Sequence, residues 1–243
     1  MDNLADTWVY LSVSPLFHLT ITLVAFQGAN WLFERAGRTP LLNPVMVAVL
    51  FVVGILLATG TDYATYFEGA QFVHFLLGPA TVALAIPLYR QWHLVRRSAL
   101  AIAVSLTTGS LTAMVSAVAI VWVLGGAPDL MVSIAPKSTT APVAMGISEA
   151  LGGLPSLTAV LVIVTGILGA MLGPILLNAM GITDWRARGF AIGTASHGIG
   201  TARALSVNET AGAFSGLAMG LNAFATALML PVLWAGLSWA FVP

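Results

Sequence analysis

Long apolar stretches separated by short charged clusters dominate this chain and restrict how it can fold. Only 7% of its 243 residues are charged and 58% are hydrophobic, whereas soluble domains carry about 25% charged residues. In lipid, every backbone polar group must be bonded internally, and an apolar stretch of about 20 residues satisfies this requirement as a helix. The pattern therefore predicts an all-α polytopic membrane protein with a single transmembrane domain over residues 1–243.

Six apolar stretches are long enough to cross a bilayer as full transmembrane helices. They cover residues 9–33, 42–59, 69–89, 98–124, 154–180 and 211–241. Two further stretches, the first motif segment (131–151) and the second motif segment (189–205), are interrupted by Gly, Pro and hydroxyl residues. Re-entrant or discontinuous helical segments of this kind occur in secondary transporters, where protein or water covers the irregular backbone.

Seven of the nine cationic residues lie in three clusters, which predict the orientation of the chain. The clusters are Arg35 and Arg38; Arg90, Arg96 and Arg97; and Arg186 and Arg188. The positive-inside rule places them in the cytoplasm. Acidic residues before and between the clusters then lie outside: Asp2, Asp6, Asp62, Glu68 and Asp129. We therefore expect a multi-pass protein of the cell inner (cytoplasmic) membrane with its N-terminus outside.

The charges also predict how the two motif segments enter the membrane. Two apolar stretches lie between Asp129 on the expected outer side and Arg186 on the inner side, so one of them does not cross. We expect the part from Pro136 to Pro142 to enter from outside and turn back, and the part from Gly193 to Arg203 to enter from inside. Discontinuous helices that cross fully are the alternative.

A sequence offset of 57 residues relates the two motif segments. It aligns Pro136 with Gly193, Thr139 with Ser196 and Pro174 with Pro231. Because a re-entrant piece plus one span is an odd number of passes, this repeat would be inverted. The same offset also pairs Pro79 with Pro136, where the expected topology gives no inversion.

Lys137 and Arg203 are the two cations outside the arginine clusters, and each lies in a motif segment. A charge inside a membrane normally faces a protein interior or a wet cavity and marks a functional site. Arginine offers a planar fork that matches a carboxylate, whereas lysine adds a point charge. We therefore predict that Lys137 and Arg203 hold the carboxylate of a small substrate near the membrane midplane.

Polar neighbours of these two cations complete the predicted substrate site, because hydroxyl groups can bond a second substrate oxygen. The further predicted substrate-binding residues are Ser138, Thr139, Thr140, Ser196, His197 and Thr201. A structural alternative pairs Lys137 with Glu149 and Arg203 with Glu209. The hydroxyls would then only bond backbone groups freed by Gly and Pro.

His197 is the one histidine inside a motif segment. Histidine titrates near neutral pH, so His197 is a candidate for proton coupling; a neutral histidine bonded to a backbone carbonyl is the alternative. Residues expected to line the pocket around these groups are Pro79, Thr81, Pro136, Pro142, Gly193, Gly198, Gly200 and Asn222. For Asn222, a simple hydrogen bond between helices is the alternative.

The residue pattern does not favour catalysis or a cofactor. Gly193 precedes Ser196 by three positions, which does not match the Gly-x-Ser-x-Gly nucleophile motif. No histidine pair has metal-ligand spacing, and the net charge of zero argues against nucleic acid as a partner. We expect no enzyme activity, no cofactor and no metal.

Three signatures resemble the LrgB/CidB family, which includes the plastidal glycolate/glycerate translocator. They are the stretch from Phe75 to Tyr89 (FLLGPATVALAIPLY), Pro136-Lys137-Ser138 followed by threonines and Pro142, and the stretch from Gly193 to Ala204 (GTASHGIGTARA). The chain departs from the family pattern at Thr139-Thr140-Ala141, where the family usually reads Val-Thr-Thr, and at Gly198, where it commonly has Ala.

This resemblance implies export or exchange of small monocarboxylates such as glycolate, glycerate or pyruvate. Bacterial members have also been linked to the control of murein hydrolases and cell lysis, with a small membrane partner of the LrgA/CidA type. We therefore expect a secondary transporter of small 2-hydroxy or 2-oxo monocarboxylates in the lipid bilayer. Because transporters of this size often dimerise, we expect a homodimer. A holin-like or regulatory membrane protein that acts through such a partner is the alternative.

Overall fold

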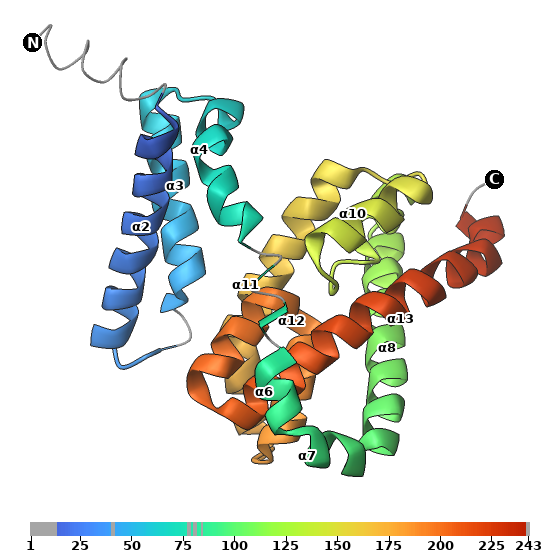
Figure 1. The fold of residues 1–243 in the computed structure, drawn as a ribbon. Coiled ribbons are helices and arrows are strands. Elements are labelled where there is room, and N and C mark those ends of the chain that lie inside the picture. The colour runs from blue at the N-terminus through green and yellow to red at the C-terminus, as the bar shows by residue number, and fades with distance from the viewer. Residues whose placement is uncertain (1–13, 40–41, 77–78, 80–81, 84, 242–243) are drawn as a thin grey trace, which may run out of the picture. The chain divides into compact units, whose positions relative to one another are not determined.

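The computed structural model describes residues 14–39, 42–76, 79, 82–83 and 85–241 (Figure 1). Every regular element in these ranges is a helix, as the sequence predicts. The chain separates into two compact units, Met1–Ala83 and Leu84–Pro243. The expected single domain over 1–243 stays a prediction.

Proline and capping residues set where many of these helices begin. Pro15, Pro44, Pro128 and Pro155 each occupy the first turn of a helix, where the missing N–H costs nothing and the fixed φ suits the helix. Asn43 caps its helix by accepting hydrogen bonds from the backbone N–H groups of residues 45 and 46. The local sequence therefore explains where these helices begin.

The first unit contains α2 (Pro15–Arg35), α3 (Pro44–Thr59) and α4 (Tyr63–Phe75). α2 packs against both of the others. Small residues let α2 and α3 approach, with Ala25 and Ala29 buried beside Ala48 and Val52. Thr22 and Tyr66 share a hydrogen bond of 2.8 Å between α2 and α4.

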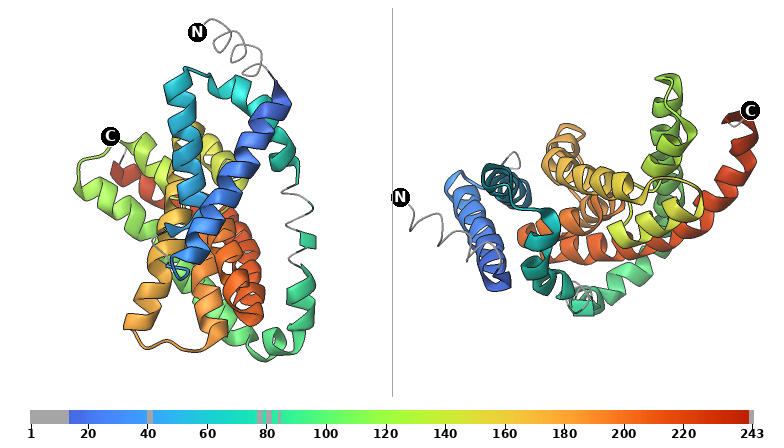
Figure 2. Two further views of the ribbon diagram at one scale, coloured as in Figure 1. Left: turned by 90° about the vertical axis from the view of Figure 1, so that its left-hand side faces the viewer. Right: turned by 90° about the horizontal axis from the view of Figure 1, so that it is seen from above.

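The second unit begins with the short helices α6 (Ala85–Arg90) and α7 (Trp92–Arg97). The long helix α8 (Ala99–Val123) leads to α9 (Pro128–Ile134) and α10 (Ala141–Ala150). They are followed by α11 (Pro155–Ala179), α12 (Trp185–Val207) and α13 (Glu209–Phe241). α13 packs along α12 and also touches α6, α8 and α10 (Figure 2).

Four helices are long and apolar enough to cross a membrane in the part of the chain that the structure describes: α2, α8, α11 and α13 as far as Gly236. Most ends of these four helices lie within a few residues of the ends of four predicted spans. The stretch 42–59 forms α3, an apolar helix of 16 residues. The stretch 69–89 includes residues outside the described ranges, and α4 already ends at Phe75. The count of six full spans therefore stays a prediction.

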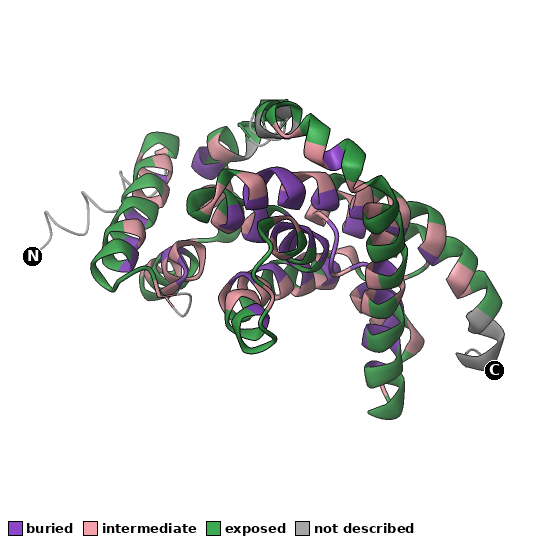
Figure 3. Cartoon of the chain, turned by 90° about the horizontal axis from the view of Figure 1, so that it is seen from below, coloured by how far each residue is buried: buried purple, intermediate pink, exposed green. Residues whose placement is uncertain are grey.

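Large apolar side chains cover the outer faces of the long helices. Leu100 and Val123 on α8 are 80% and 75% exposed, and Val232 on α13 is 73% exposed. Figure 3 shows exposed residues along the outer sides of the helices, with buried residues mainly where another helix packs. Exposed apolar surface of this extent suits contact with lipid rather than water.

The predicted outer position of the N-terminus depends on residues 1–13, which lie outside the described residues.

Two contacts between arginine and tryptophan agree with the expectation that the arginine clusters lie at a membrane interface. The guanidinium of Arg35 lies 4.6 Å from the ring centroid of Trp31, and that of Arg188 lies 5.3 Å from the ring centroid of Trp185. Tryptophan is enriched at membrane interfaces, where one side of the ring is apolar and the other is wet.

Candidate functional site

The first motif segment forms a helical hairpin made of α9, a turn at residues 135–140, and α10, which we call the first hairpin. Ser133 on α9 accepts a hydrogen bond at its hydroxyl from the backbone N–H of Leu154 (2.8 Å), directly before α11. Its carbonyl accepts another from Thr158 (3.0 Å) on α11. The chain that leaves α10 therefore returns to the side of α9, so this segment turns back.

The turn of the first hairpin follows from its prolines. The N–H of Lys137 bonds the carbonyl of Ile134 (3.0 Å), and that of Thr139 bonds the carbonyl of Pro136 (3.1 Å). Thr140 is extended, with φ −68° and ψ 145°, as expected for the N-cap residue directly before α10. Pro136 is buried at the turn, whereas Pro142 is exposed.

The second motif segment is a hairpin as well, because α12 breaks at His197, where φ is 41° and ψ is −132°. A Cβ placed on Gly200 would lie 3.1 Å from the backbone oxygen of Ile192. Residues eight apart in a continuous helix are separated by about 12 Å along the axis. The arm after His197 therefore folds back on the arm before it, and we call α12 the second hairpin.

Close backbone contacts hold the second hairpin against α13. Gly189 and Gly193 lie so near to Ala211 and Ser215 that an added Cβ would overlap their backbone oxygens. Thr201 on the returning arm bonds the hydroxyl of Ser215 at 2.9 Å. One turn of α13 thus touches both arms, and small residues make this approach feasible.

The two hairpins open toward opposite ends of the second unit. Both ends of the second hairpin lie beside predicted cytoplasmic arginines: Asp184, which precedes it, lines a cavity with Arg97. Glu209, which follows it, pairs with Arg90 at 3.6 Å. α8 leads from the arginine end to the first hairpin, and α11 leads back. This arrangement is compatible with two segments that enter a membrane from opposite faces, and their re-entrant position stays a prediction.

Asn222 on α13 joins the two hairpins. Its amide nitrogen donates to the carbonyl of Ser138 at the first turn (2.9 Å) and to the carbonyl of Thr194 on the second hairpin (3.1 Å). Its amide oxygen accepts from the hydroxyl of Ser110 on α8 (2.5 Å). Asn222 is 1% exposed, so this side chain bonds three other elements from a buried position. These contacts agree with the alternative expected for Asn222, a hydrogen bond between helices. The sequence does not show which residues are its partners.

Two buried hydroxyls near this junction have no hydrogen-bond partner among the described residues: those of Thr139 and Ser196. Both residues are fully buried, and they are a pair aligned by the offset of 57. Each lies one residue before the cap of a helical arm, α10 in one case and residues 198–207 in the other. Ser196 points at Gly169 of α11, where an added Cβ would overlap its hydroxyl and lie 3.0 Å from its own Cβ.

His197 at the tip of the second hairpin bonds the carbonyl of Val162 on α11 through its Nε2 (2.9 Å). The ring fits there because Gly166 lacks a side chain: a Cβ at that position would lie 2.5 Å from ring carbon Cε1. The carbonyl of His197 accepts from Thr201 (2.8 Å). The geometry agrees with a histidine bonded to a carbonyl, and proton coupling stays a prediction.

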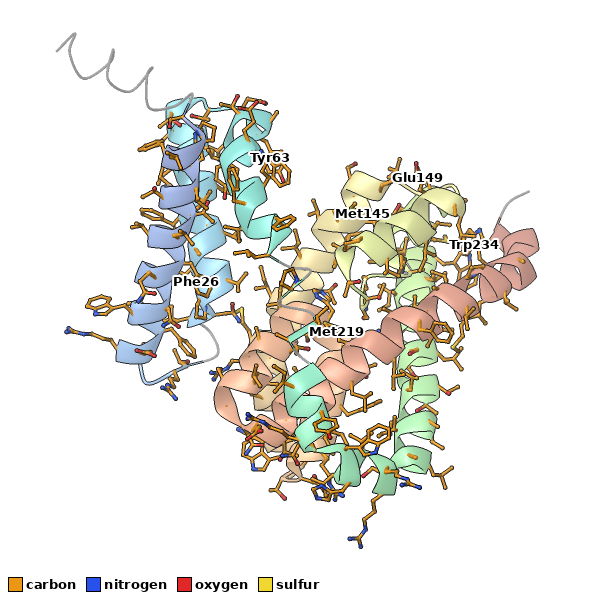
Figure 4. The ribbon with its side chains drawn as sticks, viewed as in Figure 1. Phe26, Tyr63, Met145, Glu149, Met219 and Trp234 are labelled. Carbon is orange, nitrogen blue, oxygen red and sulfur yellow. The ribbon has the colours of Figure 1, made fainter. Side chains whose placement is uncertain are left out.

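The two cations occupy partly exposed positions. Lys137 donates to the neighbouring hydroxyl of Ser138 at 3.3 Å and makes no ion pair with Glu149. Glu149 is exposed at the end of α10 away from the turn (Figure 4). Glu209 pairs with Arg90. Among the described residues, the ion pair between Lys137 and Glu149 that the structural alternative expects is therefore absent. A common ligand for Lys137 and Arg203 stays a prediction.

The remaining predicted pocket residues are divided between the units. Gly193 and Gly200 are buried within the second hairpin, and Gly198 is exposed, with Met219 as the nearest neighbour of an added Cβ, 3.8 Å from its sulfur (Figure 4). Pro79 lies in the first unit and is exposed, and Thr81 lies outside the described residues. Neither is placed relative to this site.

The sequence profile of the LrgB-like family matches residues 22–235 of the chain. A protein of Bacillus subtilis (strain 168) named "Uncharacterized protein YwbG" is 34% identical over 225 residues, covering 93% of this chain and 98% of that protein. "Holin-like protein CidB" of Staphylococcus epidermidis is 35% identical over 215 residues, covering 88% and 93%. "Holin-like protein CidB" of Staphylococcus aureus (strain Mu50) is 32% identical over 221 residues, covering 91% and 96%. No solved structure matches.

Proposed function

Because the chain belongs to the LrgB-like family, we propose that it is a holin-like or regulatory protein of the cytoplasmic membrane that acts with a small partner of the LrgA/CidA type. The observation that carries this proposal is the alignment with holin-like relatives over nearly their whole length, 93% of the Staphylococcus epidermidis protein. Control of murein hydrolase activity and cell lysis would be its consequence. The names of these relatives favour this function over the transporter that the residues alone suggest first.

The geometry supports a way in which a partner could control such a protein. Helices α8, α11 and α13 present apolar outer faces to lipid or to a partner helix. Between these helices, Asn222 donates hydrogen bonds to both hairpins. A partner whose binding breaks these hydrogen bonds would open a polar path between the two hairpins, which enter from opposite ends. Six full spans, an inverted repeat and a homodimer belong to this proposal.

A second candidate function, exchange of small 2-hydroxy or 2-oxo monocarboxylates, is favoured by one specific observation. Thr139 and Ser196 are fully buried, and their hydroxyls have no partner among the described residues. An oxygen-rich ligand at the junction of the hairpins would satisfy both. In this candidate, Lys137 and Arg203 hold the carboxylate, Ser138, Thr140 and Thr201 complete the polar lining, and His197 carries a proton.

Purified protein in proteoliposomes tests the first proposal against the second. We expect the chain to release a trapped small solute only when a LrgA/CidA-type partner is reconstituted with it. Saturable counterflow of glycolate, glycerate or pyruvate by the chain alone would contradict this expectation and favour exchange. In that case Arg203→Lys, which keeps the charge and loses the planar fork, should weaken binding roughly tenfold, the equivalent of about 1.4 kcal/mol.

A further inference from the structure

A cavity of about 290 Å³ lies at the arginine end of the second unit, away from the junction of the hairpins. It is lined by residues that start α8 and α12 and by α13. Figure 1 shows the starts of α8 and α12 at the same end of this unit. The volume is near the lower end of the roughly 300–1,000 Å³ that small-molecule sites occupy. It suits a compact polar group better than a large ligand.

The inner wall of this cavity is apolar. Phe190 on α12 and Phe214 on α13 are buried in the same core cluster, and both line the cavity. Ala101 and Ile102 of α8 complete the wall. Ala101 is exposed, so this wall continues onto the outer face of α8, where Leu100 and Val104 are 80% and 55% exposed. A ligand in the cavity therefore has an apolar surface beside it.

The rim of the cavity carries the charges of Arg97, Arg186 and Asp184. Asp184 and Arg186 neutralise each other through several hydrogen bonds, the shortest being 2.5 Å. The hydrogen bond from the side chain of Arg186 lowers the pKa of Asp184 from 3.8 to about 2, so this carboxylate stays ionised at physiological pH. Among the described residues, Arg97 has no ion pair or hydrogen bond of its side chain. The rim is thus left with one net positive charge, carried by Arg97.

Two hydroxyl residues add polar groups to the lining of this cavity. Ser98, the cap residue of α8, makes no side-chain capping hydrogen bond, and Ser105 lies two turns further along the same helix. Both line the cavity. One positive charge, two hydroxyls and an adjoining apolar face suit an amphiphilic monoanion. A basic pocket between transmembrane helices on the cytoplasmic side is a typical position for an anionic lipid headgroup.

We propose that this cavity binds the headgroup of an anionic phospholipid of the cytoplasmic leaflet, with the phosphodiester at Arg97 and Ser98 and the acyl chains on the outer face of α8. The bound lipid would stabilise the start of the second hairpin, because Asp184, Ala187 and Phe190 at this start line the same cavity. This site is independent of the proposed function, since a holin-like protein and a transporter would both contain it.

Thermal unfolding in detergent, with added lipid, tests the site. Phosphatidylglycerol should raise Tm saturably, whereas phosphatidylcholine, which has no net charge, should not. Arg97→Gln should weaken the apparent affinity for phosphatidylglycerol roughly fivefold, which corresponds to about 1 kcal/mol for one basic residue near the surface. The matched control is Arg96→Gln, because Arg96 is an exposed neighbour that does not line the cavity. It should change the affinity by less than about twofold.

A second pair of variants tests the cavity without changing any charge. Ala101→Trp should fill the space and abolish the stabilisation, while Ala103→Trp, on an exposed position of α8 outside the cavity, should preserve it. Equal effects of Arg96→Gln and Arg97→Gln would overturn the proposal in favour of general surface charge. Equal stabilisation by phosphatidylcholine would also overturn it. If glycerol 3-phosphate without acyl chains binds as tightly as the lipid, the site takes a free anion and the lipid assignment is wrong.

Discussion

Asn222→Leu is expected to lower the stability of the protein by about 2–4 kcal/mol and to separate the two hairpins. Leucine has nearly the same size but no amide, so the carbonyls of Ser138 and Thr194 and the hydroxyl of Ser110 lose their partner in a buried region. Each buried polar group left unpaired costs about 1–3 kcal/mol. Hydrogen bonds inside membrane proteins average less, near 0.6 kcal/mol, because the polar groups find other partners. The expected total therefore lies below the simple sum.

Thermal unfolding in detergent measures this effect, and Asn178→Leu is the matched control. Asn178 lies on α11 and is exposed, so its replacement should change Tm by less than about 2 °C. Asn222→Leu should lower Tm by roughly 5–10 °C, because 1 kcal/mol shifts the Tm of a chain of this size by about 2–4 °C. If both variants unfold at the same temperature as the parent, Asn222 does not hold the hairpins.

Gly193→Val is expected to cost about 3 kcal/mol or more, or to prevent folding. A Cβ at this position would lie 2.8 Å from the Cα atom of Ser215 and overlap its backbone oxygen. The obstacle is backbone rather than a movable side chain, so the second hairpin would have to move away from α13. Overpacking of well-packed interiors typically costs 1–3 kcal/mol, and occasionally more.

Gly198→Ala is the control for this second prediction, because it changes a glycine of the same hairpin. The nearest atom to an added Cβ there is the sulfur of Met219 at 3.8 Å, an ordinary contact. Alanine also favours helix by up to about 1 kcal/mol over glycine. Gly198→Ala should therefore unfold at the parent temperature or slightly above. A Gly193→Val protein as stable as Gly198→Ala would show that the contact between the second hairpin and α13 is looser than in this structure.

Much of the fold could be predicted from the sequence, because membrane insertion depends on local composition. The stretches 98–124, 154–180 and 211–241 contain α8, α11 and α13 within a few residues, since apolar length alone determines a span. The breaks in both motif segments were also predictable. Pro136 and Pro142 cannot continue a helix in the usual way, and the charges at Asp129 and Arg186 favour a first motif segment that turns back, with discontinuous helices that cross fully as the alternative.

The site was predicted less completely, because its contacts join residues far apart in the sequence. Asn222 was recognised as a polar residue in an apolar span, but its bonds to residues 84 and 28 positions away depend on how α13 packs. The sequence does not reveal the hydrogen bonds of Ser110 and Ser215, because each is a small hydroxyl residue in an apolar helix, a common feature without a visible partner. Residue identity suggested Lys137 and Arg203 as ligands, and their common substrate remains a prediction.

Two hairpins that enter the membrane from opposite faces are the feature on which both proposed functions depend. The chain has no cysteine, so single cysteines can be labelled without background at four exposed positions: Ala127, Ala150, Thr183 and Ser206. In intact cells, an impermeant maleimide should label Ala127→Cys and Ala150→Cys, which flank the first hairpin. Thr183→Cys and Ser206→Cys, which flank the second, should react only after the membrane is permeabilised. If the two positions that flank either hairpin label from different faces, that segment crosses the membrane and the account is wrong.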